Sequence, residues 1–231
     1  MKLPKNRWEA FAAHFAISLL ILLGPLAIVI LFWYPGALFA AAGGWQGTRI
    51  MVMIALVTGP LLTLAVFSHA KPRRLLNRDL LIIGALQLSS LLAGVTILYA
   101  ERPVAVIYSI DKFYALKRSD FAANGKNPKE LHLSLMSPVY FQVDLGAGSR
   151  EEALILNNLC LMFGKNILFR NDLYKPLPRN MAEARNALRF SKLPLSPLPP
   201  GRCLTAELVT SYEEDAVCFD PVQQRLEKLI R

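Results

Sequence analysis

Three long apolar runs in the first hundred residues constrain the fold more than any other feature of the sequence. They cover about residues 13–33, 50–67 and 80–99. A helix of about 20 apolar residues crosses the ~30 Å hydrocarbon core of a bilayer. The first run is longer than the apolar region of a typical signal peptide, and no small-x-small cleavage site follows it cleanly. We therefore predict a membrane protein with a three-helix transmembrane domain over residues 1–100, its first helix retained as an anchor.

The composition changes after residue 100, where apolar and charged residues mix as they do in a soluble domain. Residues 101–231 are numerous enough to form one independent core. Segments that are apolar or alternate in polarity predict strands at residues 104–110, 113–117, 139–145, 203–211 and 216–219. Capping patterns and helical periodicity predict helices at residues 150–163, at about 179–190, and after Asp220–Pro221. The expected C-terminal domain is α+β with a small, mostly antiparallel sheet.

The distribution of basic residues predicts the orientation of the spans. Of the formal net charge of +9, residues 1–100 carry +6 and the remainder +3. The N-terminal tail has three Lys/Arg and the second loop has four, whereas Arg49 is the single one in the first loop. Cytoplasmic loops are enriched in Lys/Arg, so the N-terminus is expected in the cytoplasm and residues 101–231 outside it. Basic residues beside a bilayer also account for the net charge, and no nucleic-acid partner is expected.

The first loop has an unusual composition. Its sequence, FWYPGALFAAAGGWQG over Phe32–Gly47, is uncharged, is rich in small residues, and carries aromatic rings near both ends. Tyr and Trp favour the membrane–water boundary, and small residues let another segment approach closely. Two interpretations remain open: a tight turn between helices with interfacial anchors, or a surface on which another membrane segment docks.

Several residues inside the apolar runs are polar or break helices. Gly24–Pro25 and Gly59–Pro60 predict kinks, which leave a shallow groove or are plain packing features. Gln87 is expected to hydrogen-bond to another helix, as are the neighbouring serines. His14 has two interpretations: its side chain reaches the nearby headgroups, or it contacts an acidic residue on another membrane helix.

No catalytic motif stands out in the sequence. The chain has no GxSxG, HExxH, P-loop or GxGxxG pattern, so no catalytic residue and no cofactor are predicted. Metal binding is not expected, because the three cysteines lack CxxC spacing and His132 is the single histidine after residue 100. Cys203 and Cys218 flank the predicted hairpin and are expected to form a disulfide in an oxidising compartment, with Cys160 buried as a thiol.

The first 110 residues resemble the type IV pilin accessory protein family, the TfpX/TfpZ group. The similarity lies in four segments of the sequence: RWEAF–H–ISLL (7–20), WYPGALFAAAGGWQG (33–47), GPLLTLAVF (59–67) and RPVAVIY (102–108). The resemblance implies a non-enzymatic protein of the bacterial inner membrane that supports assembly of a cognate major pilin into pili, alongside other pilus assembly proteins. It also implies a periplasmic C-terminal domain, which would meet the globular head of the pilin.

The resemblance suggests which residues meet the pilin. The apolar N-terminal helix of a pilin lies in the same bilayer, and its acidic residue lies at the depth of His14. The hypothetical partner-binding residues are His14, Tyr34, Pro35, Gly36, Gly43, Gly44, Trp45, Gly47, Gly59 and Pro60. The alternative function is a membrane enzyme, or an enzyme component, that modifies pilin or the cell envelope.

Overall fold

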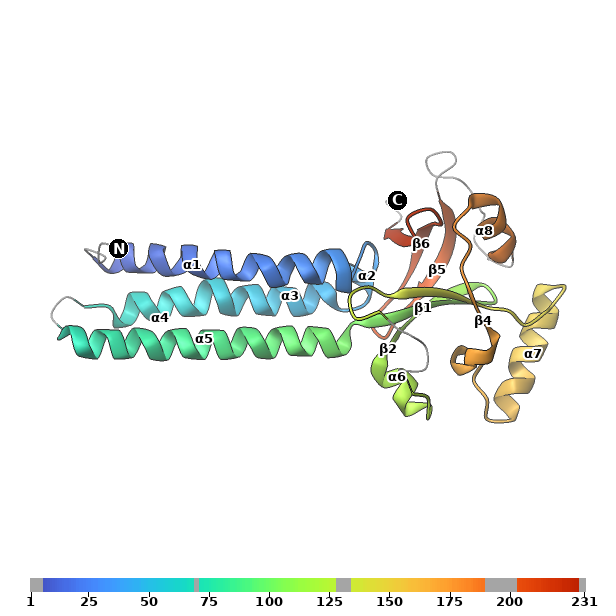
Figure 1. The fold of residues 1–231 in the computed structure, drawn as a ribbon, viewed down its shortest axis with the longest axis horizontal. Helices are drawn as coiled ribbons and strands as arrows, with labels where there is room; N and C mark the ends of the chain where they lie inside the picture. Colours follow the sequence, from blue (N-terminus) through green and yellow to red (C-terminus); the bar gives the residue numbers. More distant parts are fainter. Residues whose placement is uncertain (1–5, 69–70, 128–133, 190–202, 229–231) are drawn as a thin grey trace. The chain divides into compact units, whose positions relative to one another are not determined.

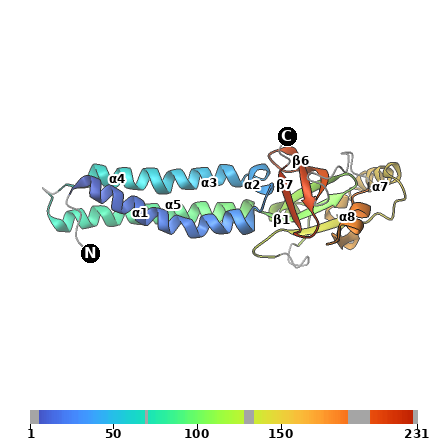
Figure 2. The same cartoon turned by 90° about the horizontal axis from the view of Figure 1, so that it is seen from above.

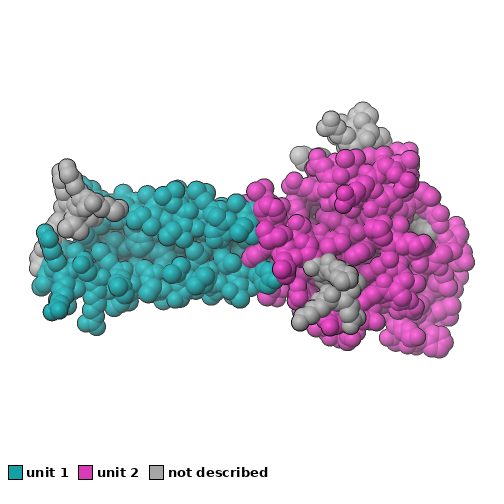
Figure 3. Space-filling model, in the orientation of Figure 1, with its two compact units in different colours: residues 1–29, 45–99 teal, residues 30–44, 100–231 magenta. Residues whose placement is uncertain are grey.

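The computed structural model describes residues 6–68, 71–127, 134–189 and 203–228. The chain forms two compact units, each built from two separate stretches of sequence. Unit 1 consists of Met1–Val29 and Trp45–Tyr99, and unit 2 of Ile30–Gly44 and Ala100–Arg231 (Figure 3). Most of the first loop therefore belongs to the same unit as the C-terminal domain.

Unit 1 consists of helices long and apolar enough to cross a membrane. Three such helices cover Arg7–Trp33, Gly44–Val66 and Arg73–Glu101, each including an apolar run identified in the sequence. They run alongside one another: α1 (Arg7–Ile28), the helix that contains α3 (Gly44–Met53) and α4 (Gly59–Val66), and α5 (Arg73–Glu101) (Figures 1 and 2). The side chain of Asn6 accepts a hydrogen bond from the Glu9 amide and so caps the start of α1.

The two Gly-Pro pairs differ in their effect on the helices. Pro25 lies within α1, which stays helical to Ile28 and then continues as a π-helical segment, η1 (Val29–Trp33). Pro60 instead follows a π-helical segment, η2 (Ile54–Thr58), which joins α3 to α4. A proline has no amide hydrogen to donate, and a local π segment is one way in which a membrane helix accommodates that loss.

Unit 2 is built around a seven-stranded sheet whose strand order is β4-β3-β1-β2-β5-β6-β7. The interior strand β1, between β3 and β2, is buried along its whole length. The strands are β1 (Pro103–Ser109), β2 (Lys112–Lys117), β3 (Val139–Val143), β4 (Tyr174–Pro176), β5 (Leu204–Val209), β6 (Glu214–Asp220) and β7 (Arg225–Lys228).

The expectation of a mostly antiparallel sheet is wrong, because the sheet is mixed. β1 pairs in parallel with β3, and β2 pairs in parallel with β5, while the other four pairings are antiparallel. Parallel neighbours require a long crossover connection. The crossovers here contain the helices α6 (Arg118–Ala123), α7 (Arg150–Met162) and α8 (Met181–Ala187).

The end of the chain also differs from the sequence prediction. Asp220 does cap a turn, since its carboxylate accepts from the amides of Val222 and Gln223. No helix follows in the described residues: Gln224 adopts a positive φ of 50° and the chain returns as β7, paired with β6. The sequence also predicts a Pro-rich connector at residues 194–200, which lie outside the described residues.

The first loop packs against this last strand. It contains a short helix, α2 (Leu38–Ala41), and the Ala37 amide donates to the carbonyl oxygen of Leu226 in β7 at 2.8 Å. The Thr210 hydroxyl donates to the carbonyl oxygen of Ala41 at 2.6 Å. Leu38 is fully buried. The loop therefore covers an edge of the sheet that would otherwise expose unpaired backbone groups.

Candidate functional site

A polar cluster lies among the apolar helices of unit 1. The imidazole of His14 on α1 lies 2.5 Å from the Thr63 hydroxyl on α4 and 2.6 Å from the side-chain oxygen of Gln87 on α5. The Gln87 amide nitrogen donates to Ser18 Oγ at 2.7 Å and to the carbonyl oxygen of Ala55 at 2.8 Å. One glutamine thus joins α1, η2 and α5.

The hydrogen-bond partners determine which ring nitrogen of His14 carries a proton. The carbonyl of Ala55 can only accept, so the nitrogen of the Gln87 carboxamide must face it and the carboxamide oxygen must face His14. That oxygen also only accepts, so Nε2 of His14 is the donor. In the neutral ring, Nδ1 then accepts the hydroxyl hydrogen of Thr63. Every polar group in this chain of contacts has a partner, which is required where water is excluded.

Gly59 makes room for this arrangement. A β-carbon at position 59 would overlap the carboxamide of Gln87, so no other residue fits without displacing that side chain. Pro60 and Thr63 beside it are buried. The Gly59–Pro60 pair therefore allows α4 to pack closely against Gln87 of α5.

A cavity of about 140 Å³ adjoins the polar cluster. Its walls are apolar side chains of α1 and α5, with His14, Ser18 and Gln87 also lining it. Gly84 lies on its α5 side, and a β-carbon there would meet nothing within 4 Å. We call this feature the α1/α5 groove. The apolar residues that line it are Ile17, Ile21, Ala55, Leu88 and Leu91.

The first-loop residues predicted to bind a partner are mostly engaged within unit 2. Tyr34 is 1% exposed, and its burial raises the pKa of the phenol, so the hydroxyl stays neutral. Gly36 has a φ of +64° and lies against the Leu226 carbonyl. Gly43 has a φ of +86° and lies under the ring of Tyr212. Gly44 packs against Phe39 and Tyr34, and Pro35 is half-buried.

The remaining predicted residues lie in unit 1. Gly47 packs closely against Leu98 of α5, where a side chain at position 47 would overlap Leu98. Trp45 is 53% exposed and is the predicted first-loop residue with a large accessible surface. The structure therefore brings together His14, Gly59 and Pro60 at the polar cluster, and separately gathers Tyr34, Gly36, Gly43 and Gly44 around α2.

Cys203, immediately before β5, and Cys218 on β6 are joined by a disulfide, with Cα atoms 5.5 Å apart. The pair is the one predicted from the sequence. Cys160 is a free thiol on α7, but it is partly exposed rather than buried as expected from the sequence. Among the described residues, no group of three His, Cys, Asp or Glu side chains is arranged to hold a metal ion.

The sequence pointed to Gln87 but missed two other members of the polar cluster, Ser18 and Thr63. Serine and threonine are common in membrane helices, where their hydroxyls usually bond to their own helix, so Ser18 and Thr63 did not stand out. Ser89 and Ser90, predicted to bond to other helices, instead donate to the carbonyls of Ala85 and Leu86 in α5. Thr63 could have been singled out in the sequence because it lies one turn after the Gly59–Pro60 pair.

Comparison with known proteins connects the chain to pilus assembly. The chain is similar to fimbrial assembly proteins of Dichelobacter nodosus. It is 28% identical over 107 residues to the proteins of serogroup E1, of serogroup I, and of serogroups C1 and C2. The match covers 46% of this chain, 42% of the E1 and I proteins, and 82% of the C1 and C2 protein. The chain thus matches less than half the length of the first two relatives.

No protein-family model matches the chain. No solved structure matches it either. The similarity to fimbrial assembly proteins, together with three helices suited to a membrane, supports a role in pilus assembly at the cell envelope.

Proposed function

We propose that this chain is a non-enzymatic accessory protein of the TfpX/TfpZ type, which supports assembly of a cognate type IV pilin into pili. The observation that carries the proposal is the similarity to fimbrial assembly proteins. The three apolar helices agree with it, because a pilin subunit awaiting assembly has an apolar helix in the bilayer and needs a partner there.

The proposed location is the inner membrane, with the N-terminus in the cytoplasm and residues 101–231 in the periplasm. The charge asymmetry of the loops supports this orientation. The disulfide between Cys203 and Cys218 suits an oxidising compartment. Reporter fusions after residue 231 test the orientation: alkaline phosphatase activity is expected there, and fluorescence of a cytoplasmic reporter would contradict it.

Within the membrane, the α1/α5 groove is the proposed binding site of the pilin helix. The groove is apolar, and Gly84 presents no side chain to an approaching helix. Small residues allow close backbone approach, and the resulting van der Waals packing favours helix association in lipid. The bilayer itself covers the outer faces of the three helices.

The role of His14 changes in this proposal. Both of its ring nitrogens have partners within the bundle, so a pilin carboxylate would bind His14 only by replacing Thr63 or Gln87. We therefore assign His14 to holding α1, α4 and α5 in register, which shapes the groove. Among the predicted first-loop residues, we keep Trp45 as a direct contact of the pilin, because the glycines and Tyr34 pack within this chain.

The alternative function, a membrane enzyme that modifies pilin, is distinguished by one experiment. The gene is deleted, pili on the cell surface are counted by electron microscopy, and the intact mass of the pilin is measured. The accessory role predicts a loss of pili with unchanged pilin mass. Normal piliation in the deletion strain contradicts the proposal, and a changed pilin mass supports the enzymatic alternative.

A further inference from the structure

Unit 2 contains a cavity of about 310 Å³ that the proposed function does not use. It lies where the ends of β1 and β3 meet α7, α8 and the loop after β3. Tyr108 and Gln142 are neighbours in the parallel pairing of these two strands and both line the cavity. We call it the outer pocket. Its volume falls within the range of small-molecule and side-chain binding sites, about 300–1,000 Å³.

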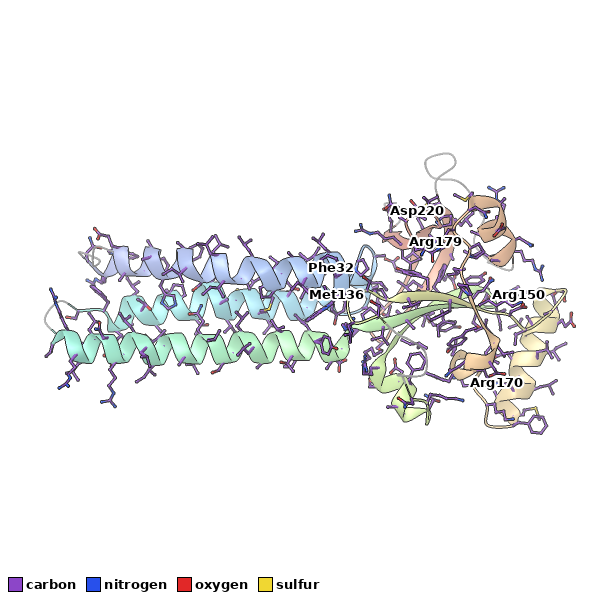
Figure 4. All side chains as sticks on the ribbon, viewed as in Figure 1. Phe32, Met136, Arg150, Arg170, Arg179 and Asp220 are labelled. Carbon is purple, nitrogen blue, oxygen red and sulfur yellow. A yellow bond between two sulfur atoms is a disulfide. The ribbon has the colours of Figure 1, made fainter. Side chains whose placement is uncertain are left out.

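The wall of the outer pocket includes a strained turn. Ile110 has a φ of 61°, which is rare for a β-branched residue, and the Asp111 amide donates to the Ser109 carbonyl at 2.8 Å. This three-residue turn is a γ-turn of the uncommon, strained hand. The Asp111 carboxylate accepts from Arg150 at the start of α7, at 2.7 Å (Arg150 is labelled in Figure 4). Strain of this kind is often found at functional sites.

Most charged groups at the outer pocket are already paired. Asp144 forms an ion pair with Lys175 and accepts from the Gly146 amide, and these contacts hold its pKa below the ordinary value. Arg189 donates to the Ala147 carbonyl at 2.7 Å. Within the described part of the chain, the Glu183 carboxylate forms no hydrogen bond and no ion pair.

Two carboxamides accompany Glu183 at the opening. Gln142 projects from β3 and Asn186 lies one turn after Glu183 on α8. In the part of the chain that the structure describes, neither side chain has a hydrogen-bond partner. Each carboxamide offers a donor and an acceptor, the same pair of groups that a peptide bond presents. The Tyr108 hydroxyl, by contrast, is used in a bond to the Leu188 carbonyl, and burial raises its pKa.

We propose that the outer pocket binds a short peptide segment carrying a lysine side chain. The carboxamides of Gln142 and Asn186 pair with the peptide groups, and the Glu183 carboxylate receives the ammonium group. The apolar wall formed by Ile110, Val143 and Leu145 accommodates the aliphatic stem of the lysine. The flanking Arg179 and Arg185 do not line the pocket, and the Arg189 guanidinium is held by the Ala147 carbonyl. Of the charged groups that line the pocket, the Glu183 carboxylate is the one without a hydrogen-bond partner among the described residues.

Saturation-transfer NMR on the full chain in detergent micelles tests this proposal. The probe is acetyl-Gly-Lys-Gly-amide, and the matched peptides carry norleucine or glutamate in place of lysine. The lysine peptide is expected to receive saturation from the protein, and the Glu183→Gln variant is expected to bind it about tenfold more weakly. The matched control is Glu213→Gln, which removes a carboxylate from the exposed turn between β5 and β6 and leaves binding unchanged.

A second variant separates loss of the pocket from loss of the fold. Ala187→Phe places a ring in the opening and is expected to abolish binding while the melting temperature stays near that of the parent. Equal saturation of the lysine and norleucine peptides overturns the proposal, as does unaltered binding by Ala187→Phe. Saturation of N-acetylglucosamine without saturation of the lysine peptide also overturns it, because the pocket would then be a carbohydrate site.

Discussion

The side-chain oxygen of Gln87 lies 2.6 Å from Nε2 of His14, a residue 73 positions earlier in the chain. This contact joins the first and third membrane helices at the point where Thr63 of the second helix also reaches the ring. Hydrogen bonds between membrane helices contribute about 0.6 kcal/mol on average and up to ~1.7 kcal/mol. A group of four such bonds at one depth therefore contributes to holding the bundle in a single register.

Replacement of Gln87 by Leu tests this role. The change removes the partner of His14 Nε2 and of Ser18, and it removes the side-chain donor to the Ala55 carbonyl. We expect a loss of about 1–3 kcal/mol in the free energy of unfolding, measured by thermal melting in detergent. The control is Ser89→Ala on the same helix, whose hydroxyl bonds only to its own helix and whose loss should cost less than about 0.5 kcal/mol. Equal effects of the two variants would argue against the polar cluster.

A pair of glycine variants tests the fit between α4 and α5. Gly59→Ala is expected to destabilise the bundle, because the new methyl group would overlap the Gln87 carboxamide. Gly84→Ala meets nothing within 4 Å and should be neutral or slightly stabilising, since alanine favours the helix by about 1 kcal/mol over glycine. Melting temperatures in the same detergent provide the comparison. A destabilised Gly84→Ala protein with an unaffected Gly59→Ala protein would contradict this account.

The docking of the first loop on β7 is tested at Gly36. Gly36→Ala introduces strain at a φ of +64° and an overlap with the Leu226 carbonyl. Gly125→Ala introduces the same strain, at a φ of +66°, with nothing within 4 Å, and serves as the matched control. We expect a loss of about 1 kcal/mol for the control and clearly more for Gly36→Ala, measured by thermal unfolding or limited proteolysis of unit 2. Similar losses in both variants would mean that the loop does not pack on β7 in solution.

The disulfide between Cys203 and Cys218 is tested by thiol labelling. In the denatured, unreduced protein one thiol, Cys160, should react with maleimide, and three should react after reduction. The bridge closes a loop with a sequence separation of 15, for which chain entropy predicts a stabilisation of about 3 kcal/mol. The double variant Cys203→Ala/Cys218→Ala should melt at a lower temperature. Three reactive thiols without reduction would refute the pairing.

The sequence was sufficient to predict the three membrane helices, because a run of apolar residues of that length has few other stable arrangements. It also predicted the start of α7, since Ser149 accepts from the Glu152 amide as the capping pattern requires. The helical periodicity places Leu159 and Phe163 on one face of α7 with Cys160, and the structure leaves these two side chains 44% and 78% exposed. Periodicity defines an apolar face but does not say what covers it.

Long-range pairing could not be predicted from local patterns. The parallel pairings of β1 with β3 and of β2 with β5 depend on how α6, α7 and α8 return the chain, which no single segment encodes. The terminal strand was mistaken for a helix because Asp220–Pro221 is a good helix start, whereas an available partner in β6 favours β7. For the Gly-rich loop the sequence left open a tight turn or a surface on which another membrane segment docks, because its glycines fit close approach of any backbone, including that of β7.

Photo-crosslinking from the α1/α5 groove tests the central claim most directly. A benzophenone amino acid is placed at Leu88, which lines the groove and is 53% exposed. The matched position is Leu86, which is 58% exposed and lies about 200° around α5. In irradiated cells that produce pili, the account predicts a covalent adduct with the major pilin from position 88 and little or none from position 86. Absence of a pilin adduct at position 88, or equal adducts at both positions, would contradict it.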